Sequence, residues 1–266
     1  MIDLHCHMLP GIDDGAKDLA TALEMARIAV QDGIEQTACT PHIYPGMYEN
    51  ESGGILSACQ ALQARLDYEG IKLRLSYGAD THLVPEMLTG IKNGRIPTLN
   101  GTRYFLLEPP HHVAPPQFKE SVFNTVAAGY TPLITHPERL TWAEEHYEDF
   151  VELAHQGAWI QVTAGALTGR FGRNARYLAE QMLDDGIVHV IATDAHNIKS
   201  RAPLLAEGRE AAIEWVGAEE AGRMVEERPL AVLENRDPGT VTPMAAMQAG
   251  RAKGKTGGLL RRLWPF

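Results

Sequence analysis

Short apolar runs alternate with amphipathic stretches along most of this chain, and this alternation limits its fold more than any other feature. Seven runs have the length and composition of β-strands: MIDLH, IEQTACTPH, KLRLSYGAD, RYFLLEP, YTPLITHPE, AWIQVTAG and VHVIATDAH. The stretches between them show helical spacing of apolar residues, as from about Asp18 to Asp32, and several end at a glycine. Strands that alternate with helices pair in parallel, so we expect an α/β protein.

The number of predicted strands favours one α/β architecture. Seven strands with seven crossovers predict a closed or nearly closed seven-stranded (β/α) barrel that is similar to a TIM barrel. The alternative is an open Rossmann-like sheet, but no G-x-G-x-x-G motif follows the first strand. In a barrel, functional residues gather at the C-terminal ends of the strands.

The composition changes near the C-terminus, where proline, glycine, lysine and arginine become frequent. We therefore expect one domain over residues 1–236 and a mobile tail over residues 237–266. The end of the tail combines Trp264 with Arg261 and Arg262. Aromatic and basic residues together predict a weak contact with an anionic membrane surface or with a groove on a partner protein.

Charge and cysteine content exclude several classes of protein. The net charge of −10 argues against nucleic acid as a partner, because a protein that binds the phosphate backbone usually has a basic face. Three cysteines are too few for a disulfide framework. Neither a secretory signal nor an apolar run of membrane-spanning length is visible, so we expect a cytoplasmic protein.

Residues that can bind metal ions lie at the ends of six of the seven predicted strands. In chain order they are His5 and His7, with Asp14 in the following loop, then His42, Asp80, Glu108, His136, Asp194 and His196. The sixth predicted strand ends in Ala164 and Gly165, which have no ligand atoms in their side chains. Because the strand ends of a barrel meet in one ring, these side chains are expected to form one site.

The residue types in this set indicate which metals the site would bind. Imidazole and carboxylate groups without thiolates favour Mn²⁺, Fe or Zn²⁺ over copper or an iron–sulfur cluster. Nine ligands exceed the needs of one ion, so two or three ions with bridging carboxylates are expected. Such clusters commonly hydrolyse phosphoesters or amides.

Four motifs carry a resemblance to a known family. DLHCHMLPGIDDG, TPHIYPGMYE, THPER and TDAHN resemble the motifs of the polymerase-and-histidinol-phosphatase (PHP) superfamily. More narrowly, they resemble the bacterial tyrosine-protein phosphatases of the CpsB/YwqE type, which are found beside capsule and exopolysaccharide genes. The resemblance extends from Met1 to about Asn235. It implies a distorted seven-stranded barrel with a trinuclear, usually manganese-dependent centre.

The resemblance also implies a role for each site residue. It assigns His5, His7, Asp80 and Asp194 to one ion, Asp80, Glu108 and His136 to a second, and Asp14, His42 and His196 to a third. Arg139 and Arg201 match family arginines that bind the substrate phosphate. Asp80 stands where the family usually has glutamate, so its shorter side chain requires a shifted strand or a tighter cluster.

These features together predict a metal-dependent protein-tyrosine phosphatase with a metal-bound hydroxide as nucleophile. The expected substrate is the phosphotyrosine-bearing tail of a capsule-type kinase. A small-molecule phosphatase, such as a histidinol-phosphate phosphatase, is the main alternative. A metal-dependent nuclease is disfavoured by the acidic charge, and a regulatory metalloprotein would leave the two arginines without a role.

Other motifs are interpreted without a catalytic role. Cys59 and Arg65 have the C-x5-R spacing of cysteine-dependent tyrosine phosphatases, but the residues between them form a helical pattern and not a glycine-containing phosphate loop. Tyr44 and Tyr48 are expected to border the pocket. His82 lies two residues past Asp80, from where it could touch the site. The remaining histidines are predicted to be surface or packing residues: His111, His112, His146, His155 and His189.

Overall fold

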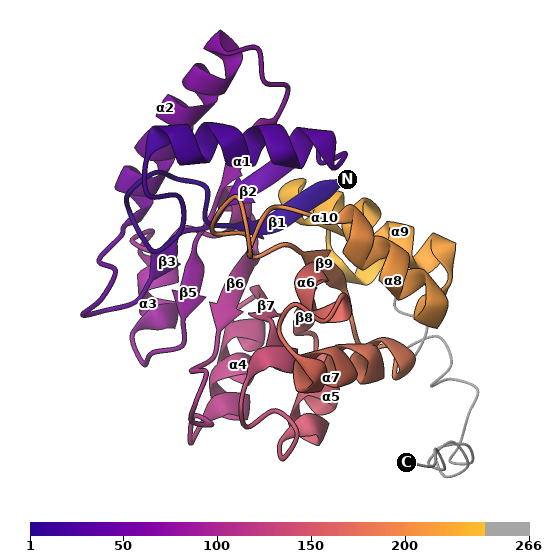
Figure 1. Cartoon of the computed structure of the whole chain (residues 1–266). Coiled ribbons are helices and arrows are strands. Elements are labelled where there is room, and N and C mark those ends of the chain that lie inside the picture. The colour runs from indigo at the N-terminus through magenta and orange to yellow at the C-terminus, as the bar shows by residue number, and fades with distance from the viewer. Residues whose placement is uncertain (243–266) are drawn as a thin grey trace.

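Parallel strands surrounded by helices make up the computed structural model, which describes residues 1–242 (Figure 1). The strands are β1 (Ile2–Cys6), β2 (Gln36–Cys39), β3 (His42–Ile43), β4 (Arg74–Tyr77), β5 (Asp80–His82), β6 (Tyr104–Glu108), β7 (Thr131–Thr135), β8 (Trp159–Thr163) and β9 (Val190–Ala192). Every pair of neighbouring strands is parallel. The predicted α/β fold with parallel strands is therefore confirmed.

The strands form two sheets, with the orders β1-β2-β4 and β3-β5-β6-β7-β8-β9. The second and third predicted strands are each split in two, as β2 with β3 and β4 with β5. Pairing stops after Cys39 and Tyr77 and resumes where His42 pairs with Asp80. Pro41 lies in this break, and a proline has no N–H group to donate to a sheet. The split lets the strands bend just before their functional ends.

The two sheets meet where β1 lies beside β9. Cys6 forms an isolated parallel bridge with Ala195, and the backbone N–H of His7 donates to the Ala195 carbonyl at 2.8 Å. Within residues 1–242, no continuous ladder closes all strands into one sheet. The closed seven-stranded barrel predicted from the sequence is therefore not confirmed.

Helices and short 3-10 turns connect the strands and cover their outer sides. The α-helices are α1 (Leu19–Gln31), α2 (Ser52–Tyr68), α3 (Met87–Lys92), α4 (Phe118–Ala127), α5 (Tyr147–His155), α6 (Ala164–Leu167), α7 (Arg173–Asp184), α8 (Ala206–Val216), α9 (Ala218–Val225) and α10 (Glu227–Leu233). The 3-10 turns are η1 (Leu99–Gly101), η2 (Pro137–Arg139) and η3 (Pro238–Thr240). Figure 1 shows α1 and α2 on one side of the strands and α4, α5 and α7 on the other. None of the helices in the described part of the chain is long and apolar enough to cross a membrane.

Helix α1 begins and ends close to where the sequence predicts. The Asp18 carboxylate accepts a hydrogen bond from the N–H of Thr21 at 2.8 Å, which satisfies one of the free donors of the first turn. The helix ends at Gln31, and Gly33 follows with a φ of 89°. Glycine adopts this left-handed conformation without steric cost. The predicted start and stop signals both operate.

Strand β6 shows how the alternation of a strand separates the packing surfaces. Phe105 and Leu107 lie in the larger apolar cluster. Tyr104 and Leu106 point the opposite way, into the smaller apolar cluster. Glu108 follows on this second face at the strand end. The predicted ligand Glu108 therefore lies on the same face of β6 as the residues of the smaller apolar cluster.

Two predicted ligands have a left-handed backbone, namely His136 with a φ of 36° and Asp194 with a φ of 50°. A non-glycine residue in this region costs roughly 1–3 kcal/mol and needs surrounding structure to hold it. The N–H of His136 donates to the Gln161 carbonyl, and the N–H of Asp194 donates to the His5 carbonyl, each at 2.8 Å. Neighbouring strands thus hold both turns in place, and strained residues of this kind cluster at active sites.

The predicted boundary at residue 236 remains a prediction. Residues 237–242 lie against the rest of the chain: Val241 is buried in the smaller apolar cluster, and Asp237 forms an ion pair with Arg103. The predicted membrane-contacting residues at the end of the tail lie outside the described residues.

Candidate active site

All nine predicted metal-binding residues lie together. Seven of them lie near the C-terminal end of a strand or in the loop that follows it, whereas His42 and Asp80 are the first residues of the short strands β3 and β5. The ligand atoms of the nine residues fall into five overlapping sets, one of which includes an atom of His111. Within each set, all ligand atoms lie within 4.8 Å of one another. Seven of the nine side chains are buried; His42 is partly exposed and Asp14 is exposed. The strand ends of two sheets therefore supply one continuous cluster.

The innermost part of the cluster lies between β1 and β9. Nε2 of His5 is 3.2 Å from Nε2 of His7, and each of these nitrogens is 3.3 Å from Oδ1 of Asp194. Oδ2 of Asp80 is also 3.3 Å from Nε2 of His5. Two ligands that are each about 2.1 Å from one ion lie about 3.0–3.4 Å apart in octahedral or tetrahedral geometry. The observed separations fit this spacing.

The second part of the cluster surrounds Glu108. Nδ1 of His42 is 3.4 Å from Oε2 of Glu108 and 3.4 Å from Oδ2 of Asp80. Nε2 of His136 is 3.8 Å from the other oxygen of Glu108. Asp80 thus lies between the first and second parts, where a bridging ligand is expected.

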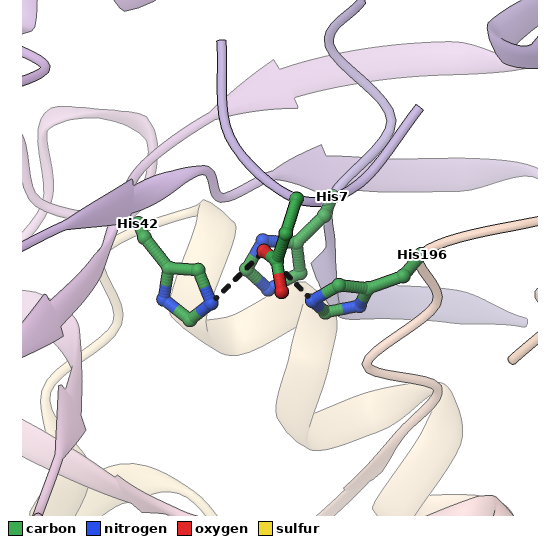
Figure 2. Close-up of side chains that lie close together, drawn as sticks. His7, His42 and His196 are labelled. Carbon is green, nitrogen blue, oxygen red and sulfur yellow. Dashed lines mark ion pairs between the residues drawn. The ribbon is translucent and has the colours of Figure 1, made fainter. Parts of the chain in front are cut away.

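The third part contains three imidazole rings and one exposed carboxylate. Oδ1 of Asp14 is 3.5 Å from Nε2 of His42 and 3.4 Å from Nε2 of His196. Figure 2 shows the rings of His7, His42 and His196 around this carboxylate, with dashed lines for the two ion pairs. This part faces solvent, since half of the Asp14 side chain is exposed.

Hydrogen bonds on the far side of three imidazole rings fix their orientation. Nδ1 of His5 contacts Oε1 of Gln161 at 2.9 Å, and Nδ1 of His7 contacts Oδ2 of Asp13 at 2.8 Å. Nδ1 of His196 contacts the carbonyl oxygen of Asp194 at 3.0 Å. Since each partner is an acceptor, the neutral rings carry hydrogen on Nδ1 and turn the Nε2 lone pair inward. Metal-binding histidines almost always show this arrangement.

Unpartnered buried atoms test whether the cluster fits metal ions. Among the described residues, neither oxygen of the fully buried Asp80 carboxylate has a hydrogen-bond partner, and the same holds for Nδ1 of His42 and Nε2 of His196. A buried polar group that lacks hydrogen-bond partners costs free energy of folding. Divalent cations would satisfy these oxygens and nitrogens together, so the residues present fit a metal cluster.

Charges in the cluster shift the pKa values of its imidazole groups. Burial lowers the pKa of His5, but Asp80 and Asp194 outweigh this effect and raise the pKa to about 9. Burial likewise lowers the pKa of His42, while Glu108 and Asp80 raise it to about 10. In the absence of metal, protons on these rings balance the carboxylates. Metal ions would have to displace those protons.

The two predicted phosphate-binding arginines both contact Asp194. Nη1 of Arg139 and Nη2 of Arg201 form ion pairs with Oδ2 of Asp194, whose other oxygen faces the histidines. Burial raises the pKa of Asp194, but His5, Arg201 and Arg139 hold it well below its usual range. The Arg139 guanidinium also lies 4.2 Å from the centre of the Phe171 ring. A cationic group is thus held beside the predicted metal cluster.

Three residues of the site were missed by sequence reasoning. Asp13 and Gln161 orient histidines, and His111 lies with Nε2 3.7 Å from Glu108. The prediction that His111 is a surface or packing residue is therefore wrong. His82 also reaches the site, since its Nδ1 is 3.6 Å from Glu108. Gln161 lies two residues before the end of β8, and this position could have indicated a role in the site. His111 lies in a loop that no sequence motif marks.

Two other predictions about the surroundings of the site are confirmed. Tyr44 and Tyr48 line the pocket above the cluster. Cys59 and Arg65 lie inside α2, where the Cys59 thiol is buried and donates to the Ser76 carbonyl at 3.6 Å. The C-x5-R spacing therefore does not form a phosphate-binding loop.

Comparison with known proteins gives consistent matches. The family model described as "Capsular polysaccharide synthesis, CpsB/CapC" matches residues 1–234. The chain is similar to the tyrosine-protein phosphatase YwqE of Bacillus subtilis, with 36% identity over 201 residues that make up 76% of this chain and 79% of the relative. It is also similar to the tyrosine-protein phosphatase CpsB of Streptococcus agalactiae serotype V, with 28% identity over 244 residues covering 88% of this chain and 99% of the relative.

A solved structure agrees with these sequence matches. It comes from work on YwqE of Bacillus subtilis and CpsB of Streptococcus pneumoniae, described as unique metal-dependent tyrosine phosphatases. The match has a TM-score of 0.85 at 34% identity and covers 91% of this chain and 99% of the other. The similarity therefore extends over nearly the whole fold described above.

Proposed function

The chain belongs to the CpsB/CapC family of capsular polysaccharide synthesis proteins, and we propose that it is a metal-dependent phosphatase that hydrolyses phosphotyrosine in a protein substrate. Relatives of this chain are named tyrosine-protein phosphatases. A solved homologue with the same fold is described as metal-dependent. The proposed activity would be carried out by the predicted metal ligands and arginines of this chain.

One observation carries the proposal: two guanidinium groups lie on the outer oxygen of a carboxylate whose inner oxygen faces the histidine cluster. Asp194 occupies this position, with Arg139 and Arg201 on one side and His5 on the other. A phosphomonoester needs cations around its non-bridging oxygens and a polarised water near phosphorus. The geometry supports both needs within one site.

Each group in the site has a defined task in this proposal. The nine proposed ligands would hold divalent cations, which would supply charge neutralisation and a water of lowered pKa. A guanidinium has five N–H donors, and Arg139 and Arg201 each use few of them on Asp194. The remaining donors are free to bind phosphate oxygens. Asp194 itself keeps both side chains aimed at the place where the phosphate would lie.

The identity of the metal, the number of ions and the source of the phosphotyrosine are further proposals. Imidazole and carboxylate ligands without thiolates suit Mn²⁺, with Fe or Zn²⁺ as alternatives, and the separations between ligand atoms accommodate two or three ions. We propose a capsule-type tyrosine kinase as the source of the phosphotyrosine, because the family is described by capsular polysaccharide synthesis. We also propose a cytoplasmic location, as expected for this role.

A comparison of two substrates tests the proposed function. With Mn²⁺ present, we expect the chain to hydrolyse a phosphotyrosine peptide with a higher kcat/KM than histidinol phosphate, because the pocket at the site is lined in part by Tyr44, Met47, Tyr48, Pro110 and Val113, which can pack on an aryl ring. Released phosphate measures both reactions. Cys59→Ser serves as the control and should match the wild type. A preference for histidinol phosphate would support the small-molecule alternative and contradict the proposal.

A further inference from the structure

A cavity of about 410 Å³ opens from the ligand cluster to the surface. Asp14, His42 and Glu108 contribute to its lining, so the cavity begins at the ligand cluster. Its volume lies within the range of about 300–1,000 Å³ that is typical of small-molecule pockets. The remaining lining comes from two loops, one around Tyr44–Tyr48 and one over residues 110–113.

The first loop is a tight turn fastened to the site. The N–H of Tyr44 donates to the Tyr48 carbonyl at 3.0 Å, and the N–H of Tyr48 donates to the Tyr44 carbonyl at 2.8 Å. The Tyr44 ring stacks on His82, with 3.9 Å between ring centroids. Met47 lies in the turn and is 64% exposed. The turn therefore holds a large apolar side chain in solvent at the edge of the cavity.

The second loop is fastened in a similar way. The indole N–H of Trp142 donates to the Pro110 carbonyl at 2.8 Å, and the backbone N–H of Thr141 donates to the His111 carbonyl at 3.0 Å. Val113 follows and is 69% exposed. Val113 and Met47 are among the most exposed large apolar residues in the described part of the chain, and both line this one cavity.

We propose that Met47 and Val113 bind the aromatic ring of the substrate phosphotyrosine, an inference that rests on the proposed function. The phosphate must reach the buried ligands, so the ring bonded to it occupies the cavity between the cluster and the surface. A flat apolar ring gains from contact with valine and with the flexible, polarisable methionine side chain. The shorter side chain of phosphoserine would place peptide backbone, and no ring, at this position. The two residues thus select aryl over alkyl phosphates.

Substitution of both residues tests this assignment. We expect Met47→Ala with Val113→Ala to lower kcat/KM for a phosphotyrosine peptide about tenfold, mainly through KM, since lost apolar contacts of this size weaken discrimination by about 10–200-fold. The inhibition constant of inorganic phosphate, which has no ring, should not change. The conservative pair Met47→Leu with Val113→Ile should retain the wild-type KM. Phe123→Ala is a matched control, because Phe123 is 57% exposed on α4 and does not line this cavity.

The possible outcomes separate this inference from the proposed function. If the wild type hydrolyses the peptide and the double alanine variant has the same KM, the ring assignment is wrong and the proposed function stands. A parallel weakening of phosphate inhibition would place the effect at the cluster and overturn the ring assignment as well. Absence of peptide hydrolysis by the metal-loaded wild type would overturn both.

Discussion

Replacement of Arg139 or Arg201 by alanine is expected to lower kcat for a phosphotyrosine peptide by about 10²–10³, the cost of removing one donor that stabilises transition-state charge. Both guanidiniums contact Oδ2 of Asp194 beside the ligand cluster, so each can also reach a phosphate bound there. Each single variant leaves Asp194 with the other arginine as partner. Metal content should therefore remain at the wild-type level, which elemental analysis would establish.

Lysine variants separate the charge of these residues from their geometry. Arg139→Lys keeps a positive charge but loses the planar pair of donors and the packing of the guanidinium on Phe171. We expect its kcat to lie between those of the wild type and Arg139→Ala. Wild-type turnover in both alanine variants would show that the arginines do not act on the phosphate.

Loss of the Asp80 carboxylate is expected to have an effect at least as large. The side chain is fully buried between the first and second parts of the cluster, with its Oδ2 3.3 Å from His5 and 3.4 Å from His42. Without this charge, neighbouring cations would repel each other with less compensation, so Asp80→Ala should lose at least one ion per chain. Activity should fall by more than about 10²-fold, because substitution of outer partners of ligands alone costs 10–100-fold.

Two further variants serve as controls for Asp80→Ala. Asp80→Glu keeps the carboxylate on a longer side chain, which the resemblance to the PHP superfamily implies at this position, so it should retain more metal and activity than Asp80→Ala. Glu220→Gln removes another buried carboxylate, which pairs with Arg228 away from the cluster, and should leave metal content unchanged. Equal metal content in Asp80→Ala and the wild type would show that Asp80 is not a ligand.

Sequence patterns predicted the parallel α/β fold because each strand and helix has strong local signals. They did not predict the break between Cys39 and His42, where strand pairing stops and resumes three residues later. They also did not predict that β1 and β9 meet through one isolated bridge between Cys6 and Ala195. Contacts between residues so distant in sequence depend on how sheets twist and bend, which hydrophobic periodicity does not encode.

Sequence patterns also pointed to the nine proposed ligands, because parallel strands bring their C-terminal ends together and most of these residues lie at or just beyond such an end. His42 and Asp80 instead begin the short strands β3 and β5. Residues that contact the proposed ligands from outside this set were harder to predict. Gln161 lies inside β8 and reaches His5 from a strand whose end has no ligand. His111 reaches Glu108 from a loop, so its position depends on the hydrogen bonds that fasten that loop.

Metal dependence of turnover tests the central claim most directly. The protein would be stripped with a chelator and titrated with Mn²⁺ while hydrolysis of a phosphotyrosine peptide and bound metal are measured together. Our account predicts no turnover in the stripped protein and full activity when two or three ions are bound per chain, because the site has nine proposed ligands and, among the described residues, both oxygens of the buried Asp80 carboxylate have no hydrogen-bond partner. Undiminished turnover in protein that holds no detectable divalent metal would contradict it.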